Sequence, residues 1–207
     1  NFCKARCVNI MPLVQSYGHL EYILKKDKYK HLREDENRLN EVCGTRPEVK
    51  KFIMNQMEEV ITLHPDIKYF HIGGDEPFRA KFCPDCKNIV TKKGKSGLYL
   101  QHINPILDFI HKKGLIPVVW DDMITSFPEI SDKLSKPLII NYWDYLPTTY
   151  RSELVLIRAW HDQRMPIRDA KKQVDKKILG IFEKYWRCES YPKEAPTFPL
   201  IKYYKDL

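Results

Sequence analysis

Short apolar runs alternate with longer amphipathic segments over much of the chain. Each run is bounded by turn residues, which predicts a buried strand. The four predicted strands span residues 8–14, 67–72, 115–120 and 138–143. Between them, apolar residues recur at spacings of three and four, which predicts amphipathic helices from Pro47 to about Leu63 and from about Ser96 to Gly114. Strands that alternate with helices in this way are typical of right-handed βαβ units and a parallel sheet.

The ends of these elements carry further signals. Thr45 is the expected N-cap of the first helix, and Gly114 is expected to end the second. Beyond residue 150 the strand pattern fades, and one more helix is expected over 168–186. We therefore expect residues 1–150 to form the core of one domain and residues 151–207 to be a divergent helical and irregular part of it.

Polar side chains follow the last apolar residue of successive predicted strands. In parallel barrels and open sheets, the carboxyl ends of the strands surround the active site. The repetition favours a TIM (β/α)8-type barrel over a doubly wound sheet. We expect that barrel to be incomplete in this chain, because its last strands are not recognisable after residue 150. The residues at the strand ends are His19, Asp75, Glu76, Asp121, Asp122, Trp143 and Asp144.

Two adjacent carboxylates, Asp75 and Glu76, follow the glycine pair Gly73-Gly74. Neighbouring side chains of a continuing strand point to opposite faces, so both acids can face one pocket only if the backbone leaves the pleat, which paired glycines permit. Like charges this close raise at least one pKa, and an apolar pocket raises it further. The pattern therefore favours general acid catalysis, with a solvated Asp-Glu turn as the alternative.

The balance of charge is basic. The chain has 35 Lys and Arg against 27 Asp and Glu, a net charge of +8. Such an excess is typical of proteins that bind nucleic acid or anionic surfaces. The lysines, however, occur mostly as pairs within helix-like segments, which favours solvated helix faces. We therefore expect no nucleic-acid partner.

The six cysteines do not define a disulfide scaffold in a chain of this length. Cys83-x-x-Cys86 invites a zinc interpretation, but no second CxxC or histidine pair follows at the spacing of a zinc finger. A structural loop with free thiols is favoured, and a metal clip or a disulfide is the alternative. We expect no metal in the catalytic site and no cofactor.

No apolar stretch is long enough for a transmembrane helix. The chain begins without Met, and its first residues have neither the apolar core nor the cleavage site of a signal peptide. These observations favour a cytoplasmic, or nuclear, location, for a chain whose N-terminal part is expected to be missing.

The run His71-Ile72-Gly73-Gly74-Asp75-Glu76 resembles the H-x-G-G-D-E signature of glycoside hydrolase family 20, the β-N-acetylhexosaminidases. Three further segments are similar to the hexosaminidase D-like branch of that family, in the same order. They are Pro12 to Glu21, Pro117 to Met123, and Trp143-Asp144-Tyr145. The resemblance covers roughly residues 1–150, and several ordered motifs make it more specific than one short pattern.

The resemblance implies retaining, substrate-assisted hydrolysis of a terminal β-linked N-acetylhexosamine. In that pattern Glu76 is the general acid and base, and Asp75 orients the acetamide of the sugar. Trp120 and Trp143 would wall the pocket of the acetamide methyl group. Other residues would bind the sugar (Asp121, Asp122, Tyr145) or fix the carboxylates (His19, His71). A purely structural role remains open for each of these aromatic, acidic and histidine residues.

Two other hypotheses remain. The family's sugar-binding arginine has no counterpart here, and its later aromatic pocket residues are not recognisable, so the second hypothesis is a non-catalytic sugar- or partner-binding remnant of the fold. The charge of +8 motivates the third, a nucleic-acid or anionic-surface binder. The expected partner is a carbohydrate with a terminal N-acetylhexosamine, and the sequence indicates no oligomeric state.

Overall fold

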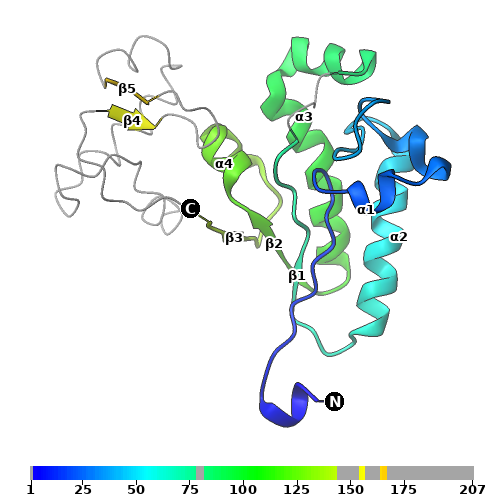
Figure 1. Cartoon of the computed structure of the whole chain (residues 1–207). Coiled ribbons are helices and arrows are strands. Elements are labelled where there is room, and N and C mark those ends of the chain that lie inside the picture. The colour runs from blue at the N-terminus through cyan, green and yellow to red at the C-terminus, as the bar shows by residue number, and fades with distance from the viewer. Residues whose placement is uncertain (1, 78–81, 144–153, 157–163, 167–207) are drawn as a thin grey trace. The chain divides into compact units, whose positions relative to one another are not determined.

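The computed structural model describes residues 2–77, 82–143, 154–156 and 164–166, which form two compact units (Figure 1). The first unit is Asn1–Trp120 with Leu134–Asn141, and the second is Asp121–Lys133 with Tyr142–Leu207. The first contains η1 (Lys4–Arg6), α1 (Glu21–Leu24), η2 (Asp27–Leu32), α2 (Pro47–Leu63), β1 (Tyr69–His71), α3 (Pro84–Lys112), β2 (Ile116–Trp120) and β3 (Ile139–Asn141). The second contains α4 (Asp122–Ser126), η3 (Pro128–Lys133), β4 (Leu154–Leu156) and β5 (Arg164–Pro166).

The first unit is built on a parallel sheet in the order β1-β2-β3. Phe70 is aligned with Pro117, and Val119 with Ile140. The long crossover helix α3 connects β1 to β2, which is the βαβ arrangement expected from the sequence. The predicted α/β architecture with parallel strands is therefore confirmed. Three paired strands do not make a closed barrel, so the TIM-type barrel stays a prediction.

The predicted strand over residues 8–14 is wrong in its extent. Only an isolated parallel bridge forms, between Leu13 and His71, supported by hydrogen bonds from Val14 N to His71 O (3.0 Å) and from His71 N to Pro12 O (2.9 Å). Val8 and Ile10 are about half exposed. An apolar run becomes a buried strand only where neighbours cover it, and within the described residues this run pairs on one edge alone.

Helix α2 matches its prediction at both ends, and Val49, Ile53 and Met57 form its buried face. The predicted N-cap is wrong: Arg46 occupies that position in an extended conformation, without a capping side chain. Pro47 fills the first helical position, where its missing N–H costs nothing. The hydroxyl of Thr45 instead lies 3.2 Å from the sulfur of Cys43.

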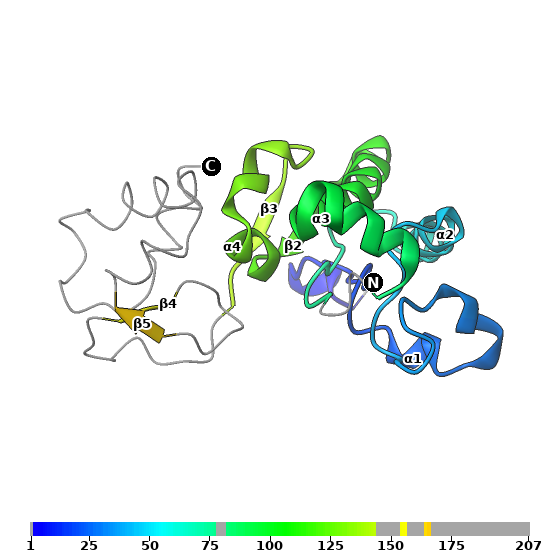
Figure 2. The same ribbon diagram turned by 90° about the horizontal axis from the view of Figure 1, so that it is seen from above.

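Helix α3 is longer than predicted. It begins at Pro84, is interrupted at Gly94 (φ 73°), and continues to Lys112, so only the part after Gly94 corresponds to the predicted helix. The expected loop around Cys83 and Cys86 is wrong, because Cys83 is the N-cap of α3. Gly114 ends the helix as predicted, in the left-handed region with φ 73°. Figures 1 and 2 show α3 beside α2, and α3 also packs against β2.

In the second unit α4 packs against η3, and β4 pairs with β5 in antiparallel orientation. The predicted helix over 168–186 and the residues Asp144 and Tyr145 lie outside the described residues. None of the described helices combines the length and apolarity needed to cross a membrane.

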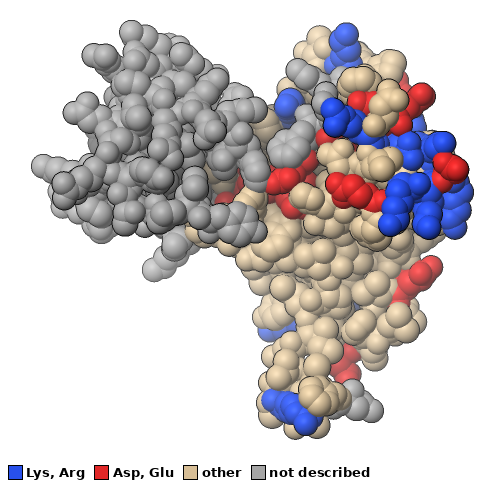
Figure 3. All heavy atoms as spheres, in the orientation of Figure 1, with Lys and Arg blue, Asp and Glu red and all other residues tan. Residues whose placement is uncertain are grey.

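Basic side chains gather on one part of the first unit (Figure 3). They include the exposed Lys25, Lys26, Lys28 and Lys30 on and beside α1 and η2. Acidic groups lie among them, and Lys30 pairs with Asp27 at 2.7 Å. The mixture of signs fits solvated helix surfaces, as the lysine pairs predict.

Replacing a buried residue of α2 should destabilise the protein strongly. The side chain of Ile53 is fully buried, so Ile53→Ala should lower the free energy of unfolding by about 2–5 kcal/mol through lost burial and the cavity left behind. Leu63→Ala, on the same helix but 76% exposed, is the matched control and should change it by less than about 0.5 kcal/mol. Urea unfolding followed by circular dichroism measures both. Equal losses would contradict the assignment of the core.

Candidate active site

The segment after β1 leaves the strand through a series of left-handed residues. Gly73 has φ 64°, Gly74 has φ 85°, and Glu76 has φ 48°. A Cβ on Gly73 would lie 1.7 Å from Oε1 of Gln15, so no larger residue fits there without moving that side chain. The glycine pair therefore turns the backbone out of the pleat, as the sequence predicts.

A second segment, residues 15–19, packs directly on this turn. A Cβ on Gly18 would lie 2.4 Å from the carbonyl oxygen of Asp75, so the two backbones touch with no side chain between them. His19 follows with φ 55°. The segment is held from α3, where Nε2 of the buried His102 donates to the carbonyl oxygen of Ser16 at 2.7 Å.

The two carboxylates converge on one imidazole. Nε2 of His19 lies 3.2 Å from Oδ2 of Asp75 and 3.2 Å from Oε2 of Glu76. The His19 side chain is 44% exposed, whereas those of Asp75 and Glu76 are 10% and 17% exposed. The backbone turn thus brings both carboxylates to one imidazole, and that imidazole is partly exposed to solvent.

Both acids are shifted toward the protonated form. Burial raises the pKa of Asp75, and the nearby His19 and a hydrogen bond from Gln15 only partly oppose this. Burial also raises the pKa of Glu76, where His19 opposes the shift and Asp75 adds to it. Desolvation is the largest cause at both residues, and the repulsion expected from their adjacency contributes at Glu76 as a smaller effect.

His71 acts on the backbone of the turn. Its Nδ1 accepts a hydrogen bond from the Gly73 amide at 3.0 Å, and the Asn141 side-chain amide lies 3.4 Å from Nε2. Its ring packs on Trp120 with centroids 4.5 Å apart, and Trp120 N donates to Gly73 O at 3.1 Å. Burial lowers the pKa of His71 to about 4, so the ring is neutral near pH 7. His71 therefore holds the Gly73 backbone, two residues before Asp75.

The remaining sequence candidates belong to the second unit. Asp121 is buried, its Oδ2 accepts from the Thr125 hydroxyl at 3.0 Å, and its Oδ1 accepts from Trp143 N at 3.2 Å. Asp122 is also buried, in the first turn of α4. Asp121 therefore makes structural hydrogen bonds, and its expected contact with the sugar stays a prediction. Tyr145 lies outside the described residues.

Two residues that support the site, Gln15 and His102, were not among the candidates from the sequence. Gln15 fills the space against Gly73, and His102 fixes Ser16. Gln15 lies in the run from Pro12 to Glu21 that resembles the family, but was given no role of its own there, and His102 lies in none of the quoted motifs. Among the described residues, the one group with metal-binding spacing is Glu34, Cys43, Cys83 and Cys86, which does not include the acid pair.

Comparison with known proteins identifies similar chains. The family described as "Glycosyl hydrolase family 20, catalytic domain" matches residues 1–186. Hexosaminidase D of Bos taurus is 29% identical over 147 residues, which is 67% of this chain and 42% of the bovine protein. Hexosaminidase D of Homo sapiens is 28% identical over 147 residues, or 30% of the human protein. The chain thus spans less than half the length of these relatives.

A solved structure agrees with these matches. The β-N-acetylhexosaminidase from Bacteroides fragilis NCTC 9343 superposes with a TM-score of 0.56 and 26% sequence identity. The match covers 68% of this chain and 29% of the bacterial chain. The same fold is therefore present in a protein whose name describes cleavage of N-acetylhexosamine.

Removing the imidazole should raise the pKa of both acids. His19→Asn keeps a residue type that tolerates the left-handed conformation but removes the group that lowers the pKa of Asp75 and of Glu76. Carboxyl carbon NMR titration of the two residues should show both pKa values moving upward. His64→Asn, at the end of α2, is the control and should leave them in place. A downward or absent shift would show that His19 does not act on the pair.

Proposed function

The chain belongs to glycosyl hydrolase family 20, and we propose that Asp75 and Glu76 act in it as the catalytic pair of a retaining β-N-acetylhexosaminidase. The proposed reaction removes a terminal β-linked N-acetylgalactosamine or N-acetylglucosamine from a glycoconjugate. The single observation that carries the proposal is the convergence of both carboxylates on Nε2 of His19.

In the first step, Glu76 donates its proton to the glycosidic oxygen as the bond to the anomeric carbon breaks. The oxygen of the sugar's own acetamide attacks that carbon and forms an oxazolinium ion. Asp75, as a carboxylate, orients the acetamide N–H and stabilises the positive charge that develops on its nitrogen. The nucleophile is held within the substrate, which supplies proximity without a covalent bond to the enzyme.

In the second step, the Glu76 carboxylate removes a proton from water, and the water oxygen attacks the anomeric carbon. The bond to the acetamide oxygen breaks, which restores the acetamide and regenerates the Glu76 carboxylic acid. Two displacements at one carbon leave its configuration retained. One residue serves as acid and then as base, which requires a pKa not far from the working pH.

The surroundings of the pair support these roles. Burial, which raises the pKa of Glu76, favours the protonated form that the first step needs. His19 is a positioning residue that contacts both acids and limits the rise in the pKa of Asp75. We assign Trp120, half-buried and fixed to the Gly73 backbone, to the acetamide pocket, because an aromatic face suits a methyl group. The substrate contacts expected of Asp121, Asp122 and Trp143 stay predictions.

We also propose that the parallel strands belong to a (β/α)8 barrel. The bridge at Leu13 and strands β1, β2 and β3 supply four successive parallel positions, and the acid pair follows the carboxyl end of β1. Active sites of such barrels lie at that end of the strands.

Loss of the acid at position 76 should abolish most of the activity. Glu76→Gln keeps the size of the side chain but removes the transferable proton, so kcat/KM for an aryl β-N-acetylhexosaminide should fall about 10²–10⁴-fold. Release of the chromophore measures the rate, with the N-acetylgalactosaminide and the N-acetylglucosaminide compared in parallel. Glu59→Gln, at an exposed position of α2, is the matched control and should retain full activity.

An unchanged rate in Glu76→Gln would remove Glu76 from the mechanism. Tight binding of N-acetylhexosamine without turnover by the unaltered chain would instead support the sugar-binding alternative. A substrate series with increasing fluorination of the N-acyl group tests the role of the acetamide separately. Fluorine weakens its oxygen as a nucleophile, so the rate should fall along the series.

The alkaline limb of the pH profile should report the protonation of Glu76. Because burial raises its pKa above the usual 4.5, activity should persist above that pH and then decrease as Glu76 loses its proton. His19→Asn should move this limb to higher pH, because His19 lowers the pKa of Glu76. The position of the limb is found from kcat/KM, which is determined from initial rates at a series of pH values. Movement to lower pH in His19→Asn would contradict the assignment.

A further inference from the structure

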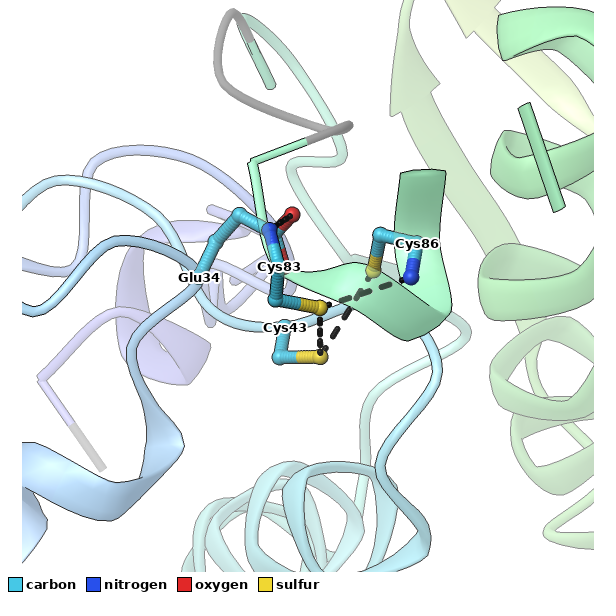
Figure 4. Close-up of side chains that lie close together, drawn as sticks. All are labelled: Glu34, Cys43, Cys83 and Cys86. Carbon is cyan, nitrogen blue, oxygen red and sulfur yellow. Dashed lines mark hydrogen bonds between the residues drawn. The ribbon is translucent and has the colours of Figure 1, made fainter. Parts of the chain in front are cut away.

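A second cluster of reactive side chains is separate from the acid pair. The sulfurs of Cys43, Cys83 and Cys86 and a carboxylate oxygen of Glu34 all lie within 4.8 Å of one another, and all four residues are buried (Figure 4). Glu34 and Cys43 come from the segment after η2, whereas Cys83 and Cys86 begin α3. The catalytic proposal assigns this cluster no task.

The spacing of the sulfurs suits a tetrahedral metal ion. Sγ of Cys43 lies 3.6 Å from Sγ of Cys83 and 3.6 Å from Sγ of Cys86. Ligands about 2.3 Å from a tetrahedral zinc ion are about 3.8 Å apart, close to both distances. A disulfide would require sulfurs about 2.05 Å apart, and three mutually adjacent thiols cannot all be paired by one such bond.

The carboxylate of Glu34 provides an independent indication. One oxygen, Oε1, accepts hydrogen bonds from the amides of Phe82 (2.8 Å) and Cys83 (3.0 Å). The other oxygen, Oε2, is buried without a hydrogen-bond partner, although the whole residue is only 3% exposed. A buried carboxylate oxygen without a donor is costly, and a cation beside it removes that cost.

Neighbouring groups are placed to stabilise cysteine thiolates. The amide of Cys86 donates to Sγ of Cys83 at 3.4 Å, at the N-terminus of α3, where the helix dipole favours negative charge. The hydroxyl of Thr45 lies 3.2 Å from Sγ of Cys43 and 3.5 Å from Sγ of Cys86. Such outer hydrogen bonds orient metal ligands and tune their charge. Lys50, half-buried and bound to Gly44 O at 3.2 Å, adds a positive charge nearby.

We propose that Glu34, Cys43, Cys83 and Cys86 bind one Zn²⁺ ion in a closed tetrahedral site. Thiolates select zinc over calcium and magnesium, which require oxygen ligands, and each thiol releases its proton to solvent when the metal binds. Four protein ligands leave no position for water, so the site is structural. It fixes the segment after η2 to the start of α3. The inference does not depend on the proposed hydrolase activity.

Metal analysis of the unaltered chain tests the proposal directly. The 207-residue protein is purified under reducing conditions from zinc-containing medium, and its metal content is measured by mass spectrometry. About one Zn²⁺ per chain is expected. After removal of zinc, added Co²⁺ should give the intense ultraviolet sulfur-to-cobalt absorption and the strong visible bands of a tetrahedral thiolate site. Readdition of zinc should raise the thermal midpoint.

Variants assign the ligands. Cys43→Ser and Cys86→Ser should reduce bound zinc about tenfold or more, whereas Cys7→Ser, at an exposed cysteine outside the cluster, should hold as much zinc as the unaltered chain. Glu34→Gln retains an acceptor for the Phe82 and Cys83 amides, so a change in the Co²⁺ spectrum there reports the metal contact itself.

Three results would overturn the proposal. One is less than about a tenth of a zinc ion per chain with all cysteines reduced. Another is a disulfide among Cys43, Cys83 and Cys86 in freshly prepared protein. The third is equal loss of zinc from Cys7→Ser and Cys86→Ser, which would indicate adsorption elsewhere. If Cys86→Ser does not fold, the cobalt spectrum of the unaltered chain still decides the question.

Discussion

The contact between the Gly18 backbone and the carbonyl of Asp75 is the constraint on which the site depends. With no side chain between them, the two segments fix each other's path, and His19 and Glu76 both adopt left-handed conformations there. Such conformations cost roughly 1–3 kcal/mol each in residues other than glycine, so the surroundings must hold them. The bridge at Leu13 and the hydrogen bond from His102 to Ser16 provide that support. Both originate in the sheet and helices of the first unit.

The sequence was informative where the determining interactions are local. The glycine pair Gly73-Gly74 predicted the turn, and the periodic apolar residues of α2 predicted that helix. Both predictions succeeded because backbone freedom and helical spacing are determined within a few residues. The direction of the pKa shifts was also foreseeable. The relative size of the two expected causes was not, because the extent to which Asp75 and Glu76 are desolvated depends on segments remote in the chain.

The errors have the opposite origin. The apolar run at 8–14 was predicted to be buried, but burial depends on covering elements that a local pattern does not contain. Thr45 is of a residue type that favours the N-cap position, yet its hydroxyl lies beside the sulfurs of Cys43 and Cys86. The Cys83-x-x-Cys86 pair did not reveal its third neighbour, because Cys43 precedes it by 40 residues in the chain. Only the fold brings these thiols together.

Two imidazoles that are buried within the described part of the chain, those of His71 and His102, make the scaffold sensitive to acid. Burial lowers the pKa values of His71 and His102 to about 4, whereas an unfolded histidine titrates near 6.5. Above pH 6.5 both rings are neutral in the folded and in the unfolded chain. Below pH 6.5 the rings take up protons in the unfolded chain but not in the folded one. The free energy of unfolding therefore falls by about 1.4 kcal/mol per pH unit for each ring, down to about pH 4. Burial also raises the pKa of Asp75, so this carboxylate takes up its proton at a higher pH than an exposed one. For the proposed hydrolysis, a loss of rate at acidic pH would therefore combine unfolding with protonation of Asp75, whereas a loss of rate at alkaline pH would report on the deprotonation of Glu76.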